Sequence, residues 1–140
     1  MLMGELITVA AYKLPIKIVV FNNSTLGLVK LEMFVGGYPD FAVDVPAVDY
    51  AAVANALGIF GQRVEDPQLL AGALADAFAH DGPALVDIAT DPLALSLPGH
   101  ISGSQVKGFA LGVSKLVLGG GAGEAIQMAR SNIRHVPGIG

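Results

Sequence analysis

Apolar residues in this chain alternate between short continuous runs and stretches with helical spacing. Residues 16–21 and 84–89 are runs rich in β-branched and aliphatic side chains, which is typical of parallel strands buried on both faces. A shorter strand is expected over residues 62–65. Between these runs, apolar residues recur every three or four positions, and this spacing predicts helices over residues 26–35 and 50–57.

Local signals mark where several helices begin and end. The first helix has apolar residues at positions 2, 6, 9 and 10, and Pro15 ends it. Asp49 is placed to cap helix 50–57, which Gly58 closes. Asp66 followed by proline predicts another helix start. The apolar stripe of that helix comprises Leu69, Leu70, Ala73, Leu74, Ala77 and Phe78.

The last third of the chain has a different pattern. Pro92 and Pro98 bracket a linker, and an amphipathic helix is expected over residues 106–117. Three glycines at 119–121 break it, and residues 124–134 read as a terminal helix. We therefore divide the chain into residues 1–90, an α/β portion, and residues 91–140, a linker with a two-helix tail.

Alternation of strands and helices predicts the α/β class. Right-handed crossovers between the strands would give a partial parallel sheet flanked by helices. The chain has 140 residues, of which 53% are hydrophobic and 14% charged, with a mean hydropathy of +0.61. No apolar run approaches the roughly 20 residues that span a bilayer. We interpret this composition as that of a segment from the interior of a larger α/β protein.

Charge and cysteine content exclude several functional classes. A net charge of −4 and a pI near 5.1 argue against nucleic acid, which requires a basic surface. The absence of cysteine excludes disulfides and thiolate metal sites. No basic segment follows Met1, so a cleaved secretory signal is not expected and a cytoplasmic location is the default.

Two adjacent amides, Asn22 and Asn23, follow directly after the first predicted strand. Ligands of open α/β sheets bind beyond the carboxyl ends of the strands. Amide oxygens and the backbone carbonyls that follow can surround a hard cation. Asparagine is also a common turn residue, so the residue types alone leave a turn and a ligand site both open.

The stretch from Lys17 to Glu32 resembles the second half of the thiamin diphosphate signature, whose first half is Gly-Asp-Gly. It is most similar to the pyruvate oxidase and quinone-dependent pyruvate dehydrogenase family. The resemblance continues through residues 81–87 and 129–132, but Gly-Asp-Gly is absent. It implies the carboxyl-terminal part of a thiamin diphosphate-binding domain, with the first strands of the fold upstream of Met1.

The resemblance also implies roles for individual residues. Asn23 and the backbone carbonyl of Thr25 would hold the Mg²⁺ that accompanies the diphosphate. The aspartate that completes this metal site in the family has no counterpart here, so we expect the isolated chain to bind the ion poorly. The remaining cofactor-binding residues implied by the family are Asn22, Leu26, Gly27, Leu28 and Val29.

Glu32 is the catalytic residue that the resemblance implies. It lies four residues after Leu28 and therefore on the same helix face, and it matches a glutamate that faces the thiazolium in pyruvate oxidases. Acetolactate synthases tend to carry tryptophan at this place. Leu28 weakens the oxidase assignment, because oxidases often have an aromatic residue there. The alternatives are ordinary core packing for Val29 and, for Glu32, a solvated glutamate paired with Lys30 or Lys13.

The function implied is oxidative decarboxylation of pyruvate, with electrons passing to FAD and then to quinone or oxygen. The family needs a separate FAD-binding domain and a glutamate from a partner subunit of a homo-oligomer. Neither is in this chain, so we expect it to be inactive alone and to partner with the missing N-terminal domains or a full-length relative. The alternatives are an acetolactate synthase-like carboligase fragment, a Rossmann-type binding module, and a non-catalytic remnant or interaction piece.

Three other features were considered as sites. The glycine-rich stretch 119–123 follows a helix rather than a strand, so a hinge is preferred to a phosphate loop. His80, His100 and His135 lack metal-ligand spacing and are expected at the surface. The terminal helix is similar to the lipid-contacting region of quinone-dependent pyruvate dehydrogenases, which implies weak peripheral contact with a membrane surface. Packing of Ile126, Met128, Ala129 and Ile133 against protein is the preferred alternative.

Overall fold

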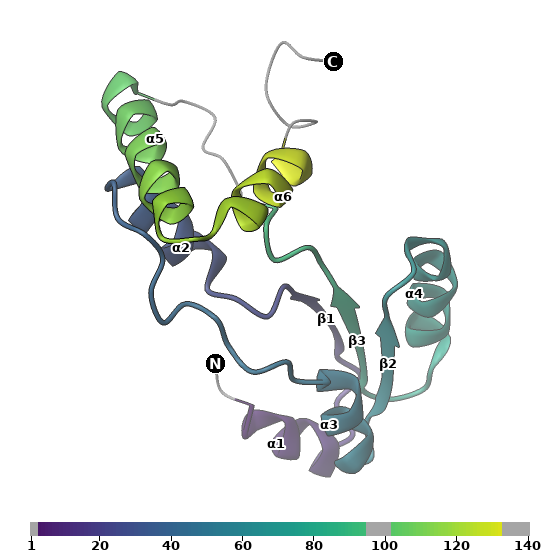
Figure 1. Ribbon diagram of the computed structural model, residues 1–140. Coiled ribbons are helices and arrows are strands. Elements are labelled where there is room, and N and C mark those ends of the chain that lie inside the picture. The colour runs from purple at the N-terminus through teal and green to yellow at the C-terminus, as the bar shows by residue number, and fades with distance from the viewer. Residues whose placement is uncertain (1–2, 95–101, 133–140) are drawn as a thin grey trace. The chain divides into compact units, whose positions relative to one another are not determined.

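The computed structural model describes residues 3–94 and 102–132 of the chain (Figure 1). These residues divide into two compact units. The first is Met1–Asn22 with Ala47–Thr90, and the second is Asn23–Pro46 with Asp91–Gly140. Each unit is described separately below. Pro98, His100, Ile133, Arg134 and His135 lie outside the described residues.

The first unit contains a three-stranded sheet. Its strands are β1 (Lys17–Asn22), β2 (Phe60–Val64) and β3 (Ala84–Ala89), arranged in the order β1-β3-β2. Both pairings are parallel, with Asn22 opposite Ala89 and Val64 opposite Ile88. The central strand β3 is buried over nearly its whole length. The predicted α/β class, with a small parallel sheet flanked by helices, is confirmed.

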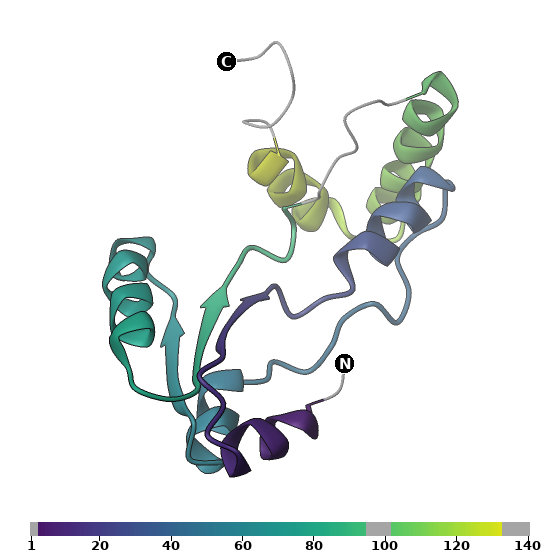
Figure 2. The same cartoon turned by 180° about the vertical axis from the view of Figure 1, so that it is seen from behind.

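Helices cover both faces of this sheet (Figures 1 and 2). Helix α4 (Leu70–Ala79), which follows the 3-10 turn η1 (Pro67–Leu69), packs on the face that carries Val64 and Val86. Helices α1 (Glu5–Ala11) and α3 (Tyr50–Ala56) pack on the face that carries Leu85. Side chains alternate between the faces of a strand, so successive residues of β3 enter different cores.

Helix caps in the first unit follow the local chemistry of the sequence. Asp49 accepts a hydrogen bond from the Ala52 amide at 2.8 Å, as predicted for the start of α3. Asp66 accepts one from the Gln68 amide at 2.9 Å at the start of η1. Gly58 has a φ of +76° after α3, which confirms the glycine-closed helix end.

The start of β2 differs from the prediction of residues 62–65. Strand β2 begins at Phe60, because the Asn55 side chain bonds both the amide and the carbonyl of Gly61, at 2.9 and 3.0 Å. A Cβ on Gly61 would lie 2.3 Å from the Ala51 carbonyl oxygen. Glycine at this position therefore allows close approach of α3 to the strand and does not mark a turn.

The second unit is helical. It contains α2 (Gly27–Val35), α5 (Gly103–Leu118) and α6 (Ala122–Asn132), which lie side by side in both views (Figures 1 and 2). Its core contains Leu31 and Phe34 of α2 with Met128 of α6, and Phe109 of α5 packs against them. Residues 26–35 fall within the predicted α/β portion 1–90, whereas their core partners Met128 and Phe109 lie in the predicted two-helix tail.

Helix α5 begins earlier than predicted. Ser102 and Gln105 form a reciprocal capping box around its start at Gly103. The break between α5 and α6 is confirmed, with Gly120 at a φ of +96°. Among the described helices, we find none that is long and apolar enough to cross a membrane.

Candidate functional site

Asn22 ends β1 and belongs to the first unit. Its side chain is 9% exposed and donates to the Val48 carbonyl at 2.9 Å and to Asp87 Oδ2 at 3.4 Å. Its backbone carbonyl accepts a bond from the Thr90 amide at 2.9 Å. Asn22 is therefore held on both its side chain and its backbone.

The loop from Asn23 to Leu26 belongs to the second unit and has a strained conformation. Asn23 Oδ1 accepts a bond from the Thr25 amide at 3.3 Å, the geometry of a side chain that mimics a turn. Ser24, between them, has a φ of +51°, which is uncommon for a residue other than glycine. Such backbone strain persists where the surroundings impose it, and it concentrates at functional sites.

Residues 43–45 hold this loop in place. The Thr25 hydroxyl donates to the Val43 carbonyl at 3.2 Å in buried surroundings. The Leu26 amide donates to the same carbonyl at 2.8 Å, and the Val45 amide donates to the Ser24 carbonyl at 3.1 Å. Thr25 and Asp44 also form an antiparallel bridge that fixes the loop.

Helix α2 begins directly after the loop, and Leu26 stands at its N-cap position. An aliphatic side chain cannot accept a bond from the first helical amides, which then favour an anion. A Cβ on Gly27 would lie 3.0 Å from Asn23 Nδ2, so glycine leaves room for Asn23 to fold over the helix start. These features fit the binding of a diphosphate.

The loop carries oxygen atoms that could serve as some of the ligands of a magnesium ion. The Asn23 carboxamide oxygen and the Thr25 backbone carbonyl are the kinds of oxygen that Mg²⁺ accepts. Within residues 3–94 and 102–132, there is no group of three or more His, Asp or Glu residues that could hold a metal ion. The described chain therefore provides amide and carbonyl oxygens for a magnesium ion but no acidic cluster.

The face of α2 that is not used for packing carries the other predicted residues. Leu28 is 67% exposed, Val29 is 45% exposed, and Glu32 is exposed on the same face. Val29 is therefore not part of a hydrophobic core of the described residues. Two apolar side chains beside a carboxylate on an open helix face are available to a ligand.

The alternative that Glu32 pairs with Lys30 is wrong, because Lys30 has other partners. The Lys30 side chain is buried and its Nζ lies 2.9 Å from Asp40 Oδ2 and 2.7 Å from Glu124 Oε1. Burial by itself lowers the pKa of Lys30, but the hydrogen bonds to Glu124 and Asp40 and their charges outweigh it and raise the pKa above its ordinary value. This ion pair ties α2 to α6 and to the loop that precedes residue 43.

Sequence reasoning missed two functional candidates of the first unit, Asp87 and Arg63. Asp87 was recognised only as part of a strand that resembles the family. It is 0% exposed, and its Oδ2 accepts from Arg63 Nη1 at 2.8 Å and from the Tyr50 amide at 3.0 Å. The detectable signal was an acidic residue within an otherwise apolar central strand.

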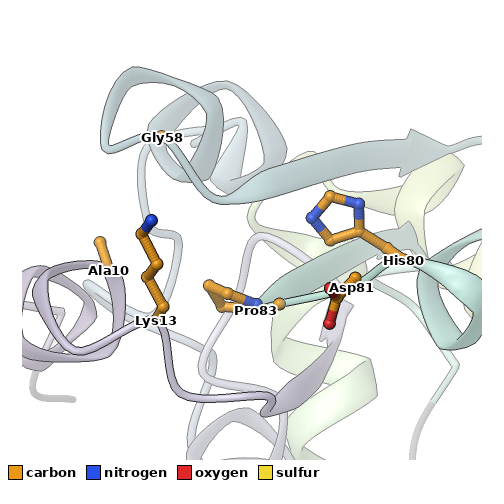
Figure 3. A pocket seen from close by; sticks show the side chains of 7 residues that line it. Ala10, Lys13, Gly58, His80, Asp81 and Pro83 are labelled. Carbon is orange, nitrogen blue, oxygen red and sulfur yellow. The ribbon is translucent and has the colours of Figure 1, made fainter.

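A separate pocket of about 250 Å³ lies at the amino ends of the strands in the first unit (Figure 3). Lys13, Gly58 and Asp81 are among its lining residues. His80 also lines it, stacked on Phe60 with ring centroids 5.0 Å apart, and it is exposed as predicted. Asn22 ends β1 at the opposite edge of the sheet, so no predicted site residue lines this pocket.

The terminal helix uses its apolar side for packing within the second unit. Met128 is 3% exposed and lies in the core with Leu31 and Phe34. The Ser131 hydroxyl donates to Asp91 Oδ2 at 2.5 Å, and Asn132 Nδ2 donates to the Leu93 carbonyl at 2.7 Å. This packing supports protein contact rather than membrane contact for Met128.

The sequence of this chain matches a known protein family. Residues 1–88 match the family described as thiamine pyrophosphate enzyme, C-terminal TPP binding domain. The chain is 40% identical over 112 residues to YdaP of Bacillus subtilis (strain 168), whose name describes it as thiamine pyrophosphate-containing. That match covers 79% of this chain and 19% of YdaP.

Two further relatives have named activities. An acetolactate synthase large subunit of Porphyra purpurea is 39% identical over 88 residues, which is 61% of this chain and 15% of that protein. A benzoylformate decarboxylase of Pseudomonas aeruginosa is 31% identical over 85 residues, or 60% of this chain and 16% of that protein. This chain therefore spans less than a fifth of the length of these relatives.

These matches agree with the geometry of the loop and helix in the second unit. They confirm the predicted thiamin diphosphate-binding domain, and they leave the pyruvate oxidase branch a prediction. With residues 1–88 covered by the family match, the chain belongs to the thiamine pyrophosphate enzymes, as part of their C-terminal TPP-binding domain.

Proposed function

We propose that this chain provides the diphosphate-binding and Mg²⁺-binding part of an enzyme that oxidatively decarboxylates pyruvate. The observation that supports this most is the strained loop from Asn23 to Leu26, which runs directly into a helix with an open face. Residues 43–45 hold the loop, so its oxygen donors are oriented before a ligand arrives. Such preorganisation lowers the cost of binding.

Each residue has a proposed task. The Asn23 amide oxygen and the Thr25 carbonyl bind the metal ion, and the first amides of α2 bind the diphosphate. Leu26 and Gly27 shape the wall beside the diphosphate, and Asn22 is a further cofactor-binding residue. When bound, thiamin diphosphate supplies the electron sink for the decarboxylation, while the protein supplies position and charge.

The choice of pyruvate oxidation rests on Glu32. A carboxylate on the open face of α2, one turn from Leu28, stabilises positive charge next to the reacting carbon. In the proposed enzyme, electrons then pass to FAD, whose binding domain is not in this chain, and on to quinone or oxygen. We propose a homo-oligomeric parent, because the family takes one activating glutamate from a partner subunit.

A second candidate function is carboligation. Acetolactate synthases are among the relatives with named activities, and aliphatic Leu28 departs from the aromatic residue common in oxidases. In that case the same loop and helix would serve a reaction that joins two 2-keto acid units without net oxidation. Glu32 is the residue that argues against it.

A chimera can separate these functions. In YdaP, the stretch of 112 matched residues is replaced by this chain, so that the rest of the protein comes from YdaP. Binding of thiamin diphosphate with Mg²⁺ is measured by isothermal titration calorimetry. Turnover of pyruvate is followed by reduction of ferricyanide and, separately, by formation of acetolactate.

We expect the chimera to bind the cofactor and to reduce ferricyanide with pyruvate. Asn23→Ala should weaken the binding, whereas Gln127→Ala, an exposed change on α6, should not. Acetolactate without dye reduction would favour carboligation. If the folded chimera binds no thiamin diphosphate while YdaP does, both proposed functions are wrong. That result would favour a non-catalytic remnant.

A further inference from the structure

Asp87 is a carboxylate in the middle of the sheet with no exposed surface. It lies on β3, opposite Val20 of β1 and Arg63 of β2. Removing a charged group from water costs several kcal/mol unless partners replace the water. The chain retains Asp87 at this cost, so its contacts require an explanation.

All its hydrogen bonds converge on one oxygen. Oδ2 accepts from Arg63 Nη1 at 2.8 Å, from the Tyr50 amide at 3.0 Å and from Asn22 Nδ2 at 3.4 Å. The donors come from β2, α3 and β1. Oδ1 is buried and has no partner among the described residues.

This arrangement is not that of a simple ion pair. An arginine that only neutralises a buried carboxylate favours a bidentate pair, with two parallel hydrogen bonds to the two oxygens. Here Arg63 divides its donors, with Nε on Glu65 Oε1 at 2.9 Å and Nη1 on Asp87. Asp87 therefore pairs with Arg63 and also accepts hydrogen bonds from the Tyr50 amide and the Asn22 side chain.

One of those groups is the Asn22 carboxamide. An amide nitrogen has two hydrogens, and the Nδ2 atom of Asn22 uses them on the Val48 carbonyl and on Asp87 Oδ2. Both donors point to fixed acceptors, so the orientation of the amide plane is set. The bond to Asp87 is long, and its strength depends on the negative charge of the acceptor.

We infer that Asp87 is a positioning residue of the cofactor site, which orients the Asn22 side chain for thiamin diphosphate. This inference rests on the proposed function of Asn22. Asp87 itself touches no cofactor in this scheme. Arg63 holds the carboxylate in place through its hydrogen bond to Oδ2, and Asn22 transmits its position.

The first test uses the 140-residue chain and the Asn22 side-chain amide signals in a ¹⁵N NMR spectrum. In Asp87→Asn, the new amide oxygen can replace Oδ2 and its nitrogen can fill the place of Oδ1, so the volume is preserved. We expect the Asn22 amide protons to shift and to exchange faster with solvent. Glu65→Gln removes the other carboxylate on Arg63 and should leave these signals unchanged.

The second test measures the affinity of the YdaP chimera for thiamin diphosphate with Mg²⁺. We expect Asp87→Asn to weaken it about ten-fold, the scale of one hydrogen bond to a charged group. Asn22→Leu should weaken the affinity by a similar factor. This second variant keeps the inference testable if the Asp87→Asn chimera fails to fold. In the Asn22→Leu background, Asp87→Asn should add no further loss, because the two residues act through one contact.

The outcomes distinguish this inference from the proposed function. Unchanged Asn22 signals in a folded Asp87→Asn chain, or additive losses in the double variant, would overturn the positioning role. Normal affinity of Asp87→Asn in a chimera that binds the cofactor would overturn the inference and leave the proposed function intact. If no chimera binds the cofactor, the proposed function fails, and the cofactor role of Asp87 fails with it.

Discussion

At the scale of single residues, Gly27 determines how Asn23 can lie. The Asn23 side chain folds back over the first residue of α2, and a Cβ at position 27 would lie within 3.0 Å of its Nδ2 atom. The φ of Gly27 is not in the left-handed region, so the requirement for glycine is one of space and not of backbone conformation. Any larger side chain would displace the amide that we propose as a magnesium ligand.

Gly27→Ala should therefore lower cofactor affinity without unfolding the protein. The added Cβ would lie 3.0 Å from Asn23 Nδ2, so the amide must shift by a few tenths of an ångström away from the start of α2. We expect about a ten-fold weaker binding of thiamin diphosphate by the chimera, an effect of about 1.4 kcal/mol, with an unchanged melting temperature. Gly123→Ala, which meets open space in the first turn of α6, is the matched control, and an equal loss there would contradict the steric argument.

At the scale of elements, α2 is held by close packing against α5. A Cβ on Gly108 would lie 1.8 Å from the Val35 carbonyl oxygen, and one on Gly112 would lie 3.0 Å from Phe34. Small residues at these two positions let the helix backbones approach, and Phe34 and Phe109 then pack with ring centroids 5.9 Å apart. The helix that carries the candidate site residues thus depends on glycines about eighty positions later in the chain.

Gly108→Ala should destabilise the second unit. The clash is with backbone, which cannot rotate away as a side chain can, so α5 must separate from α2. We expect a loss of about 3 kcal/mol in the free energy of unfolding, measured by urea denaturation followed by circular dichroism. Gly103→Ala adds a methyl group to the same helix with nothing within 4 Å, and it should leave stability unchanged or slightly higher.

The ion pair of Lys30 gives the same unit a characteristic pH dependence. Its pKa in the folded protein is raised, so the folded state holds the proton more tightly than the unfolded state. The stabilisation is fully present below the ordinary lysine pKa near 10.4. It is lost as the pH rises through the higher pKa of the folded state.

Lys30→Met should remove this contribution. At neutral pH it leaves Asp40 and Glu124 without their cation, and we expect about 2 to 4 kcal/mol of destabilisation. The difference in unfolding free energy between wild type and variant should shrink above about pH 10.5. Lys107→Met, an exposed lysine of α5, should show neither effect. A difference that stayed constant with pH would refute the electrostatic account.

At the scale of the whole molecule, the chain spans 19% of YdaP and 15% of the Porphyra acetolactate synthase. Its described residues offer amide and carbonyl oxygens for Mg²⁺ but no acidic cluster. A neutral amide and a carbonyl compete poorly with water for a doubly charged ion. The proposed reaction also needs FAD and a second subunit.

The purified chain should therefore not turn over pyruvate by itself. With thiamin diphosphate, Mg²⁺ and FAD supplied, we expect no ferricyanide reduction above that of a heat-denatured sample. Binding of thiamin diphosphate by intact YdaP serves as the control for cofactor quality. Robust oxidation of pyruvate by the 140-residue chain would contradict this expectation.

Local chemistry was sufficient to predict most of the elements. Asp49, Asp66 and Gly58 mark helix ends because each acts on backbone within a few positions of itself. The start of β2 could not be predicted, because the Asn55 side chain recruits Phe60 and Gly61 into the strand from six positions away. The amides Asn22 and Asn23 were identified as candidates from their place after a buried strand.

The partners of the site residues were beyond prediction. Pairing of Glu32 with Lys30 at the surface was one alternative, yet the carboxylates that Lys30 contacts come from a loop and from a helix 94 residues later. The bracing of the Asn23 loop by residues 43–45 and the convergence of Arg63, Tyr50 and Asn22 on Asp87 also join separate elements. Sequence spacing carries no information about such contacts.

The sequence by itself determined the class of fold and the order of strands and helices along the chain. These follow from periodicity and from side-chain chemistry, which act over a few residues, and the resemblance of residues 17–32 to a known signature indicated which amides to propose for cofactor binding. Only the tertiary structure decided which face of α2 stays open, which groups hold the Asn23 loop, and which groups contact the buried carboxylate of Asp87. Those features depend on contacts between residues distant in the chain, which form only when the elements pack together.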